Sequence, residues 1–155
     1  MTIDATDRKI LTLLQNDASL SLADIADKVN LSPTPCWRRI QKLEEAGVIA
    51  KRVALLDAAS LNLGVTVFVS IKTSQHNTAW LDRFAKAVTN IPEIVEVYRM
   101  SGDVDYLLRV VVPDISGYDA VYRKLIKNVE LTDVSSSFAM EKLKSTTALP
   151  LDYAS

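Results

Sequence analysis

The sequence predicts an α+β protein built from two domains, a helical domain followed by one that contains a β-sheet. Through about the first 47 residues, apolar side chains recur every three to four positions, which is the period of amphipathic helices. From residue 65 onward, β-branched and largely apolar runs alternate with helical stretches. A chain of 155 residues is long enough for two small domains of this kind.

The composition is ordinary for a protein with hydrophobic cores, because 48% of the residues are hydrophobic and 24% are charged. No apolar run approaches the roughly 20 residues that span a bilayer. The first ten residues also lack the apolar stretch of a signal peptide. We therefore expect a cytoplasmic protein that does not act on a membrane.

Cysteine and histidine are scarce. Cys36 and His76 are the only residues of their types, which excludes an intramolecular disulfide framework and leaves too few soft ligands for a structural zinc site. The sequence also shows no nucleophile–base pair, no cluster of metal ligands and no Gly-rich phosphate loop. We expect no enzyme activity, no metal and no cofactor.

Three short helices are predicted in the first half. Asp4, Ser21 and Ser32 are candidate N-caps of these helices, and Gly47 is placed to end the third. A turn of three to four residues separates the second helix from the third, which is typical of a helix-turn-helix. The segment after Gly47 reads as a strand or an extended linker. Residues 1–59 are thus predicted to form a helix-turn-helix domain of winged-helix-like type.

The second half predicts the order β-α-β-β-α-β. The predicted strands cover residues 65–73, 93–101, 105–113 and 134–145, and the predicted helices cover 78–91 and 116–128. Gly102 and Asp103 are a hairpin signal between the second and third strands. The order is that of the ferredoxin-like, or split βαβ, arrangement. We assign residues 60–64 to a linker, 65–145 to this domain and 146–155 to a C-terminal tail.

The third predicted helix places its cysteine inside. At 100° per residue, Cys36, Ile40 and Leu43 share the face that packs on the other two helices. A free cysteine in such a position commonly behaves as a small buried apolar residue. The nearby Arg38 and Arg39 leave an alternative open, in which the protein is a redox-sensing repressor that acts through a Cys36 thiolate.

The opposite face of this helix carries side chains suited to DNA. Thr34, Arg38 and Gln41 are spaced to reach base edges in a major groove, and the lysines and other arginines suit phosphate contacts. Residues 37–52 hold five Lys or Arg against two Glu. The alternative is a solvated face held by ordinary ion pairs. The predicted DNA-binding residues are Ser32, Thr34, Pro35, Trp37, Arg38, Arg39, Gln41, Lys42, Lys51 and Arg52.

A family resemblance covers nearly the whole chain. The segment DRKILTLLQNDASLSLADIADKVNLSPTPCWRRIQKLEEAGVI resembles the DNA-binding domain of the Lrp/AsnC, or feast/famine, transcriptional regulators. The segment SGDVDYLLRVVVPD resembles the ligand-responsive hairpin of their C-terminal RAM domain, and FAMEKLKSTTALPL is similar to the family as well. The resemblance implies a sequence-specific regulator that binds double-stranded DNA as homodimers, often assembled into octamers of four dimers. It also implies that an amino acid binds between dimers and changes assembly or DNA affinity.

The same resemblance implies an effector site at the turn between the second and third strands. Its residues are Met100, Ser101, Gly102, Asp103, Asp105 and Tyr106, with the hydroxyl residues Ser135, Ser136 and Ser137 of the last strand across from them. Gly102 would bring backbone N–H groups to a ligand carboxylate, and Asp105 would pair with its ammonium group. Val134 stands where some members of the family have threonine. A plain hairpin turn is the alternative role of the Gly-Asp pair.

Two further expectations concern the effector and the apolar surface. The segments TPCWRRIQKLE and SSFAMEKLKSTTALPL resemble the subgroup of cysteine-responsive regulators that control cysteine detoxification genes, whereas leucine and methionine are effectors elsewhere in the family.

We expect Trp80 and Phe84 in the core or a dimer contact, and His76 in a solvated loop. The alternating apolar residues of the first strand exceed what one layer of helices covers, so we assign the surplus to a dimer surface. These strand residues are Val65, Val67, Val69 and Ile71 on one face and Phe68 on the other.

Overall fold

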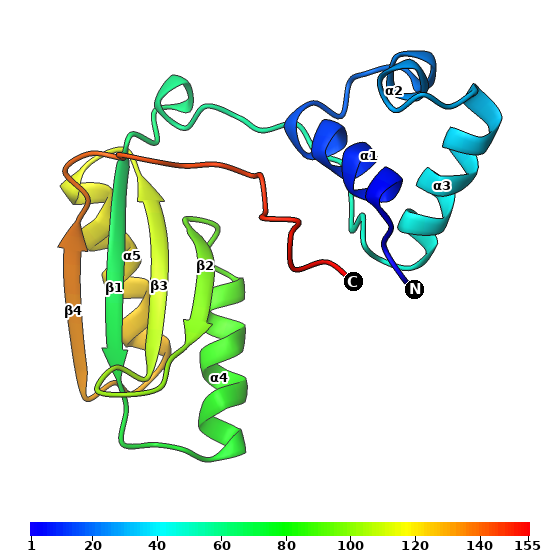
Figure 1. Cartoon of the computed structure of the whole chain (residues 1–155). Coiled ribbons are helices and arrows are strands. Elements are labelled where there is room, and N and C mark those ends of the chain that lie inside the picture. The colour runs from blue at the N-terminus through cyan, green and yellow to red at the C-terminus, as the bar shows by residue number, and fades with distance from the viewer. The chain divides into compact units, whose positions relative to one another are not determined.

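The computed structural model of the protein describes residues 1–155 and divides them into two compact units (Figure 1). The helical unit comprises Met1–Leu55 together with Leu143–Ser155, and the sheet unit comprises Leu56–Lys142. The chain therefore passes between the units twice. The C-terminal segment, Leu143–Ser155, belongs to the helical unit although it follows the sheet unit in the sequence.

The helical unit contains α1 (Ala5–Asn16), α2 (Leu22–Lys28) and α3 (Pro33–Glu45). Asp4 caps α1, and its carboxylate accepts a hydrogen bond from the Asp7 amide at 2.8 Å. The Ser21 hydroxyl caps α2 in the same way. Ser32 occupies the N-cap position of α3, but its side chain makes no capping hydrogen bond. The three predicted helices are confirmed.

Gly47 ends α3 with a backbone φ of +74°, a left-handed conformation that favours glycine. Its amide donates to the Glu44 carbonyl at 3.0 Å, which satisfies one carbonyl of the last helical turn. The residues that follow form no strand before β1, so the segment after Gly47 is an extended linker with one short 3₁₀ turn, Ala59–Leu61.

The core of the helical unit is small and draws on all three helices. Its buried members are Ile10, Leu11, Leu14, Ile25, Ala26, Val29, Cys36, Ile40 and Leu43. Leu151 of the C-terminal segment packs against this core. The Gln15 side chain exchanges two hydrogen bonds with the backbone of Leu149, at 3.1 and 2.9 Å, and the Thr147 hydroxyl donates to the Gln15 carbonyl. The segment is thus fastened to α1 by both polar and apolar contacts.

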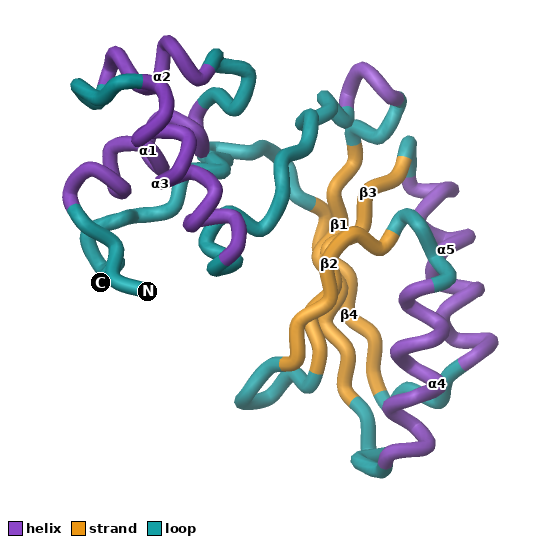
Figure 2. The backbone as a smooth tube through the Cα atoms, turned by 90° about the vertical axis from the view of Figure 1, so that its right-hand side faces the viewer, coloured by secondary structure: helices purple, strands orange, loops and turns teal.

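The sheet unit contains β1 (Val65–Lys72), α4 (Thr78–Thr89), β2 (Ile94–Arg99), β3 (Tyr106–Val112), α5 (Ile115–Asn128) and β4 (Asp133–Phe138). The strands form one sheet in the order β2-β3-β1-β4, with every neighbouring pair antiparallel. Figure 2 shows both helices on one face of this sheet. The predicted βαββαβ arrangement is confirmed.

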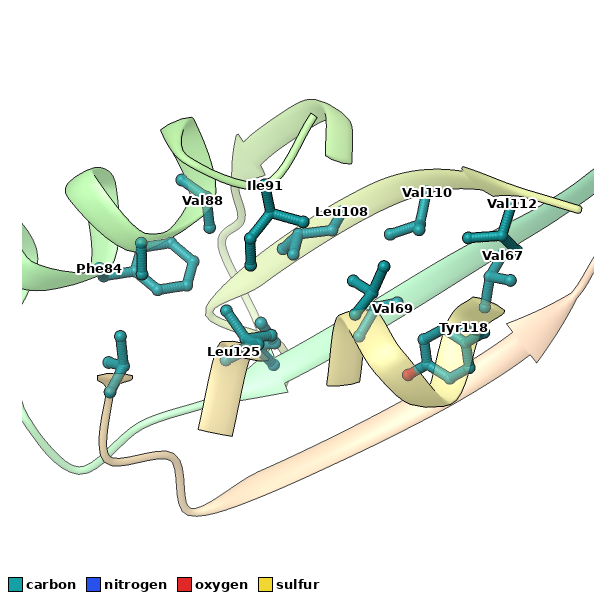
Figure 3. Close-up of a cluster of buried hydrophobic side chains, with 14 of the residues drawn as sticks. Val67, Val69, Phe84, Val88, Ile91, Leu108, Val110, Val112, Tyr118 and Leu125 are labelled. Atoms are coloured by element: carbon teal, nitrogen blue, oxygen red, sulfur yellow. The ribbon is translucent and has the colours of Figure 1, made fainter. Parts of the chain in front are cut away.

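The helix-covered face of the sheet holds the second core (Figure 3). Val67, Val69 and Ile71 of β1 are fully buried there, next to Leu108 and Val110 of β3. The two helices therefore cover these β1 residues, and the apolar surplus of β1 is reduced to Phe68 on the other face, which is 40% exposed. The opposite face of the sheet carries no helix.

Two aromatic residues of α4 anchor this core, as expected. Trp80 and Phe84 are 1% and 2% exposed, and their rings stack with centroids 5.0 Å apart. The Trp80 indole N–H donates to the Glu130 carbonyl at 2.8 Å, which satisfies its only polar group. His76 is exposed in the loop before α4.

The last strand is shorter than predicted, since β4 ends at Phe138 rather than at residue 145. The amide of Ala139 still donates to the Thr66 carbonyl at 2.9 Å. Pairing of β4 with β1 ends there, although β1 itself begins earlier, at Val65, which pairs with Val112 of β3.

Candidate DNA-binding surface and effector site

The two faces of α3 are as the helical wheel predicts. Cys36, Ile40 and Leu43 are buried in the core of the helical unit. On the outer side, Arg38 is exposed and the Trp37 side chain is 50% exposed. The other predicted DNA-binding residues that are exposed are Ser32, Thr34, Pro35, Lys42, Lys51 and Arg52, whereas Gln41 and Arg39 are half-buried.

The cations of this surface fall into two groups. The Arg39 guanidinium lies 2.7 Å from an Asp4 oxygen and 2.9 Å from an Asp7 oxygen, and Arg52 pairs with Glu44 at 2.9 Å. The cations without an ion pair are Arg38, Lys42 and Lys51. Only these three have their charge free for a phosphate or a base edge.

A hollow of about 480 Å³ lies between the start of α1 and the outer face of α3. Arg38 and Lys42 line one part of it, and Asp4, Asp7 and Arg39 line another. Two of the three unpaired cations, Arg38 and Lys42, therefore share one concavity of the helical unit with the ion-paired Asp4, Asp7 and Arg39.

The Cys36 thiol lies inside the helical core with no exposed surface. Burial raises its pKa from the ordinary value, which outweighs the opposing effect of the Arg39 charge. The reactive thiolate is therefore disfavoured at neutral pH, and the thiol is closed to an oxidant. This geometry supports a packing role for Cys36.

The predicted effector turn is tied to the end of β1. Gly102 has a φ of +108°, which a side chain would strain. The Asp105 amide donates to the Ile71 carbonyl at 2.9 Å, and one Asp105 carboxylate oxygen accepts from the Thr73 amide at 2.8 Å. Met100 and Asp105 close the turn through a backbone hydrogen bond of 2.8 Å. Ser101, Gly102 and Asp103 at its tip are exposed.

Two of the predicted effector residues face the helix-covered side of the sheet. The Tyr106 ring packs against those of Trp80 and Phe84, with centroids 5.7 and 4.6 Å away. The Ser136 hydroxyl is hydrogen-bonded to the Tyr118 hydroxyl of α5. Both side chains therefore already have partners within the sheet unit.

The remaining serines lie away from the turn within one chain. Ser135 and Ser137 are exposed and pair with Ser70 and Phe68 of β1. The turn joins β2 and β3, and β1 separates β3 from β4 in the sheet. A single chain therefore does not bring these serines to the turn.

A hollow of about 750 Å³ in the sheet unit lies between the end of α5 and the start of β4. Its lining includes Arg83, Tyr122, Lys127 and Thr132, and none of the predicted effector residues. This hollow is therefore separate from the predicted effector turn.

Comparison with known proteins decides the family. Residues 66–149 match the family model described as the Lrp/AsnC ligand binding domain, and residues 3–50 match the one described as winged helix-turn-helix DNA-binding. The chain belongs to the Lrp/AsnC family. This Lrp/AsnC protein is 51% identical over 149 residues to the glutamate uptake regulatory protein of Zymomonas mobilis, which covers 96% of this chain and 91% of that protein.

Two solved structures extend the comparison. An AsnC family transcriptional regulator from Agrobacterium tumefaciens is 64% identical, with a TM-score of 0.93 over 97% of this chain and 98% of that one. A Neisseria meningitidis transcriptional regulator in complex with L-Met is 35% identical, with the same TM-score over 98% of this chain and 99% of that one. The present Lrp/AsnC protein is accordingly a DNA-binding transcriptional regulator with an amino-acid-binding domain.

The two matches divide the Lrp/AsnC chain much as its folded units do. The DNA-binding match contains α1, α2 and α3, and the ligand-binding match contains all four strands of the sheet except Val65, the first residue of β1. The structure contains no group of three or more His, Cys, Asp or Glu side chains that could hold a metal ion. None of its helices combines the length and apolar character that crossing a membrane requires.

Sequence reasoning missed three partners in this Lrp/AsnC regulator. Asp4 was interpreted only as a helix cap and Asp7 was not singled out, and their pairing with Arg39 spans more than thirty residues. Thr73 was not singled out as the partner of Asp105. The D-x-x-D spacing does signal a cap, but no local pattern signals these long-range pairs.

Proposed function

We propose that the regulator reads duplex DNA with the outer face of α3. Arg38 carries the proposal, because it is exposed, has no ion pair and sits centrally on that face. Thr34 and Gln41 flank it at helical spacing, which suits contact with base edges in a major groove. Lys42 and Lys51 supply phosphate contacts.

We propose that the effector is an amino acid bound at the turn around Gly102. The turn offers exposed backbone and the carboxylate of Asp105, which suit the two charged ends of an amino acid. Methionine and cysteine are the first candidates. A relative is known in complex with L-Met, and the cysteine-responsive subgroup resembles two segments of this chain.

We propose that the site is completed between copies of the chain. Within one chain β1 separates the turn from Ser135 and Ser137, and the open face of the sheet leaves Phe68 and Tyr98 partly exposed. Pairing of two open faces would form the homodimer, and contacts between dimers would form the octamer. Such a regulator acts in the cytoplasm and senses its ligand without transforming it.

The DNA-binding proposal is tested by fluorescence anisotropy on DNA from the gene's own upstream region, measured over a range of salt concentrations. Arg38→Ala should weaken specific binding by about 1–3 kcal/mol if the guanidinium contacts a base. Lys124→Ala, which removes an exposed cation from α5, is the matched control and should leave affinity unchanged. Equal affinity of the Arg38→Ala variant and the parent would refute this role of α3.

The effector proposal is tested by repeating the titration with each of the twenty amino acids, with cysteine kept reduced. Asp105→Asn preserves an oxygen that accepts the Thr73 hydrogen bond but removes the charge. The variant should bind DNA normally and lose the shift caused by the effector. Asp133→Asn, at an exposed position of β4, should retain it. A full response in Asp105→Asn would sink the proposed site.

A further inference from the structure

Arg39 stands beside Arg38 on α3, yet the two side chains meet different surroundings. We propose that Arg39 is a positioning residue, which fixes the orientation of α3 by binding Asp4 and Asp7 at the start of α1 and does not contact DNA. The proposal deepens the DNA-binding role of the helical unit and rests on it. It removes Arg39 from the set of residues predicted from the sequence to touch DNA.

The carboxylates of Asp4 and Asp7 have a hydrogen-bond donor at every oxygen. Asp4 accepts from the Asp7 amide at 2.8 Å with one oxygen and from Arg39 at 2.7 Å with the other. Asp7 accepts from the Asp4 amide at 3.2 Å and from Arg39 at 2.9 Å. Each of the four carboxylate oxygens therefore has a donor. The helix cap orients both carboxylates before Arg39 joins them.

Burial of the Asp7 side chain also keeps Arg39 at the start of α1. The Asp7 side chain is 6% exposed, and that of Arg39 is 34% exposed. If Arg39 turned outward to a phosphate, Asp7 would be left buried without its cation, which is unfavourable. The two carboxylates would also repel a phosphate brought to this position. Hydrogen bonding from the Asp7 amide, and then from Arg39, lowers the pKa of Asp4, which favours the charged form of that carboxylate.

The apolar packing of α3 leaves the rotation of this helix about its own axis weakly restrained. Its apolar contacts with the core come from one stripe, formed by Cys36, Ile40 and Leu43. A single stripe restrains the distance of a helix more strongly than its rotation about its own axis. Arg39 lies on the flank of that stripe and is bound to α1 at two oxygens, which adds a rotational restraint. The next residue along the helix, Arg38, is thereby held facing outward.

The test separates positioning from phosphate contact by the salt dependence of DNA affinity. Losing a phosphate contact reduces the slope of log affinity against log salt by about 1 and weakens binding uniformly across sequences. Arg39→Ala should instead keep the slope. It should lower the ratio of specific to non-specific affinity on the order of tenfold, a size typical of coupled pairs. Lys42→Ala is the comparison variant, for which a reduced slope is expected.

Asp7→Asn supplies the second arm. If Arg39 positions α3, removing its buried partner should lower the specificity ratio as Arg39→Ala does, and the double variant should be little worse than either single one. Arg39→Lys should restore part of the ratio, because it retains the charge but not the two-oxygen geometry. Should Arg39→Ala fail to fold, judged by circular dichroism, Asp7→Asn and Arg39→Lys still provide both readouts.

The proposal is overturned if Arg39→Ala flattens the salt slope as Lys42→Ala does, or if Asp7→Asn strengthens DNA binding. Either result would mean that the Arg39 guanidinium is released to a phosphate. Failure of the wild-type protein to prefer its upstream DNA would instead refute the proposed reading by α3. The two failures are therefore distinguishable.

Discussion

The helical unit closes its core within one chain, whereas the sheet unit leaves one face of its sheet open. In the helical unit, Leu151 of the C-terminal segment covers part of a nine-residue core that α1, α2 and α3 surround. In the sheet unit, both helices lie on one side, and Phe68 and Tyr98 remain 40% and 52% exposed. The scaffold that presents Arg38 is thus complete in a single chain, while the proposed effector turn belongs to a unit that has an unpartnered face.

This difference bears on how each function is encoded. The proposed DNA-reading helix, α3, needs a rigid orientation, and its own unit offers the packing and the Arg39 ion pairs for it. A ligand can alter assembly only if it binds one association state more tightly than another. A site left incomplete in one chain and completed by a second copy has that property by construction.

The largest test of the comparison is Phe84→Ala, because two separate cores predict two separately unfolding units. Removing a ring that packs against Trp80 and Tyr106 should destabilise the sheet unit by about 3–5 kcal/mol. Hydrogen exchange should accelerate in β1 and β3 and stay unchanged in α2. Equal acceleration in α2 would mean that the two units unfold as one.

A smaller effect is expected where the C-terminal segment meets the helical core. Leu151→Ala should destabilise the helical unit by about 1–2 kcal/mol, because that side chain is partly buried against the core. Leu149→Ala is the matched control, since its side chain is 72% exposed and only its backbone bonds to Gln15. Hydrogen exchange of α1 measures both. Identical behaviour of the two variants would remove the segment from the helical unit.

The smallest effect is expected at Cys36. Cys36→Ala should cost about 1 kcal/mol, as deletion of one buried methyl group does, and a mild oxidant should leave DNA affinity unchanged in both proteins. Burial raises the pKa of this thiol above its ordinary value of 9.0. Folding therefore favours the neutral thiol, and this contribution is present below pH 9 and declines as the pH rises through the folded-state pKa.

Urea denaturation between pH 7 and pH 10 measures this effect, with Cys36→Ala as the pH-insensitive reference at that position. The parent should lose stability at the alkaline end relative to the variant. An oxidant-dependent loss of DNA binding that Cys36→Ala abolishes would revive the redox-sensing alternative.

The features that the sequence predicts well are those with a local cause. The helical period alone places Cys36 and Ile40 on the buried face of α3. Gly102 marks a turn because a φ above zero favours glycine there. The length of β4 was overestimated, because its sequence alone does not show that its pairing with β1 stops at Phe138 and Val67.

Contacts between distant residues account for the rest. Arg39 read as one more cation on a basic helix until its partners at the start of α1 were known. Ser136 read as a free hydroxyl, although Tyr118 of α5 binds it. In both cases the residue type was chemically suited to a ligand, and only the fold shows that the group already has a partner.

The C-terminal segment that fastens to α1 also affects the order of folding during synthesis. Thr147, Leu149 and Leu151 are made after the whole sheet unit, while Gln15, which binds the first two, is synthesised 134 residues before Leu149. At about 5–20 residues per second, α1 waits on the order of ten seconds for these contacts. During that interval the helical unit exposes the edge of its core that Leu151 later covers. A nascent regulator therefore completes its helical, DNA-binding unit only after the sheet unit has been made.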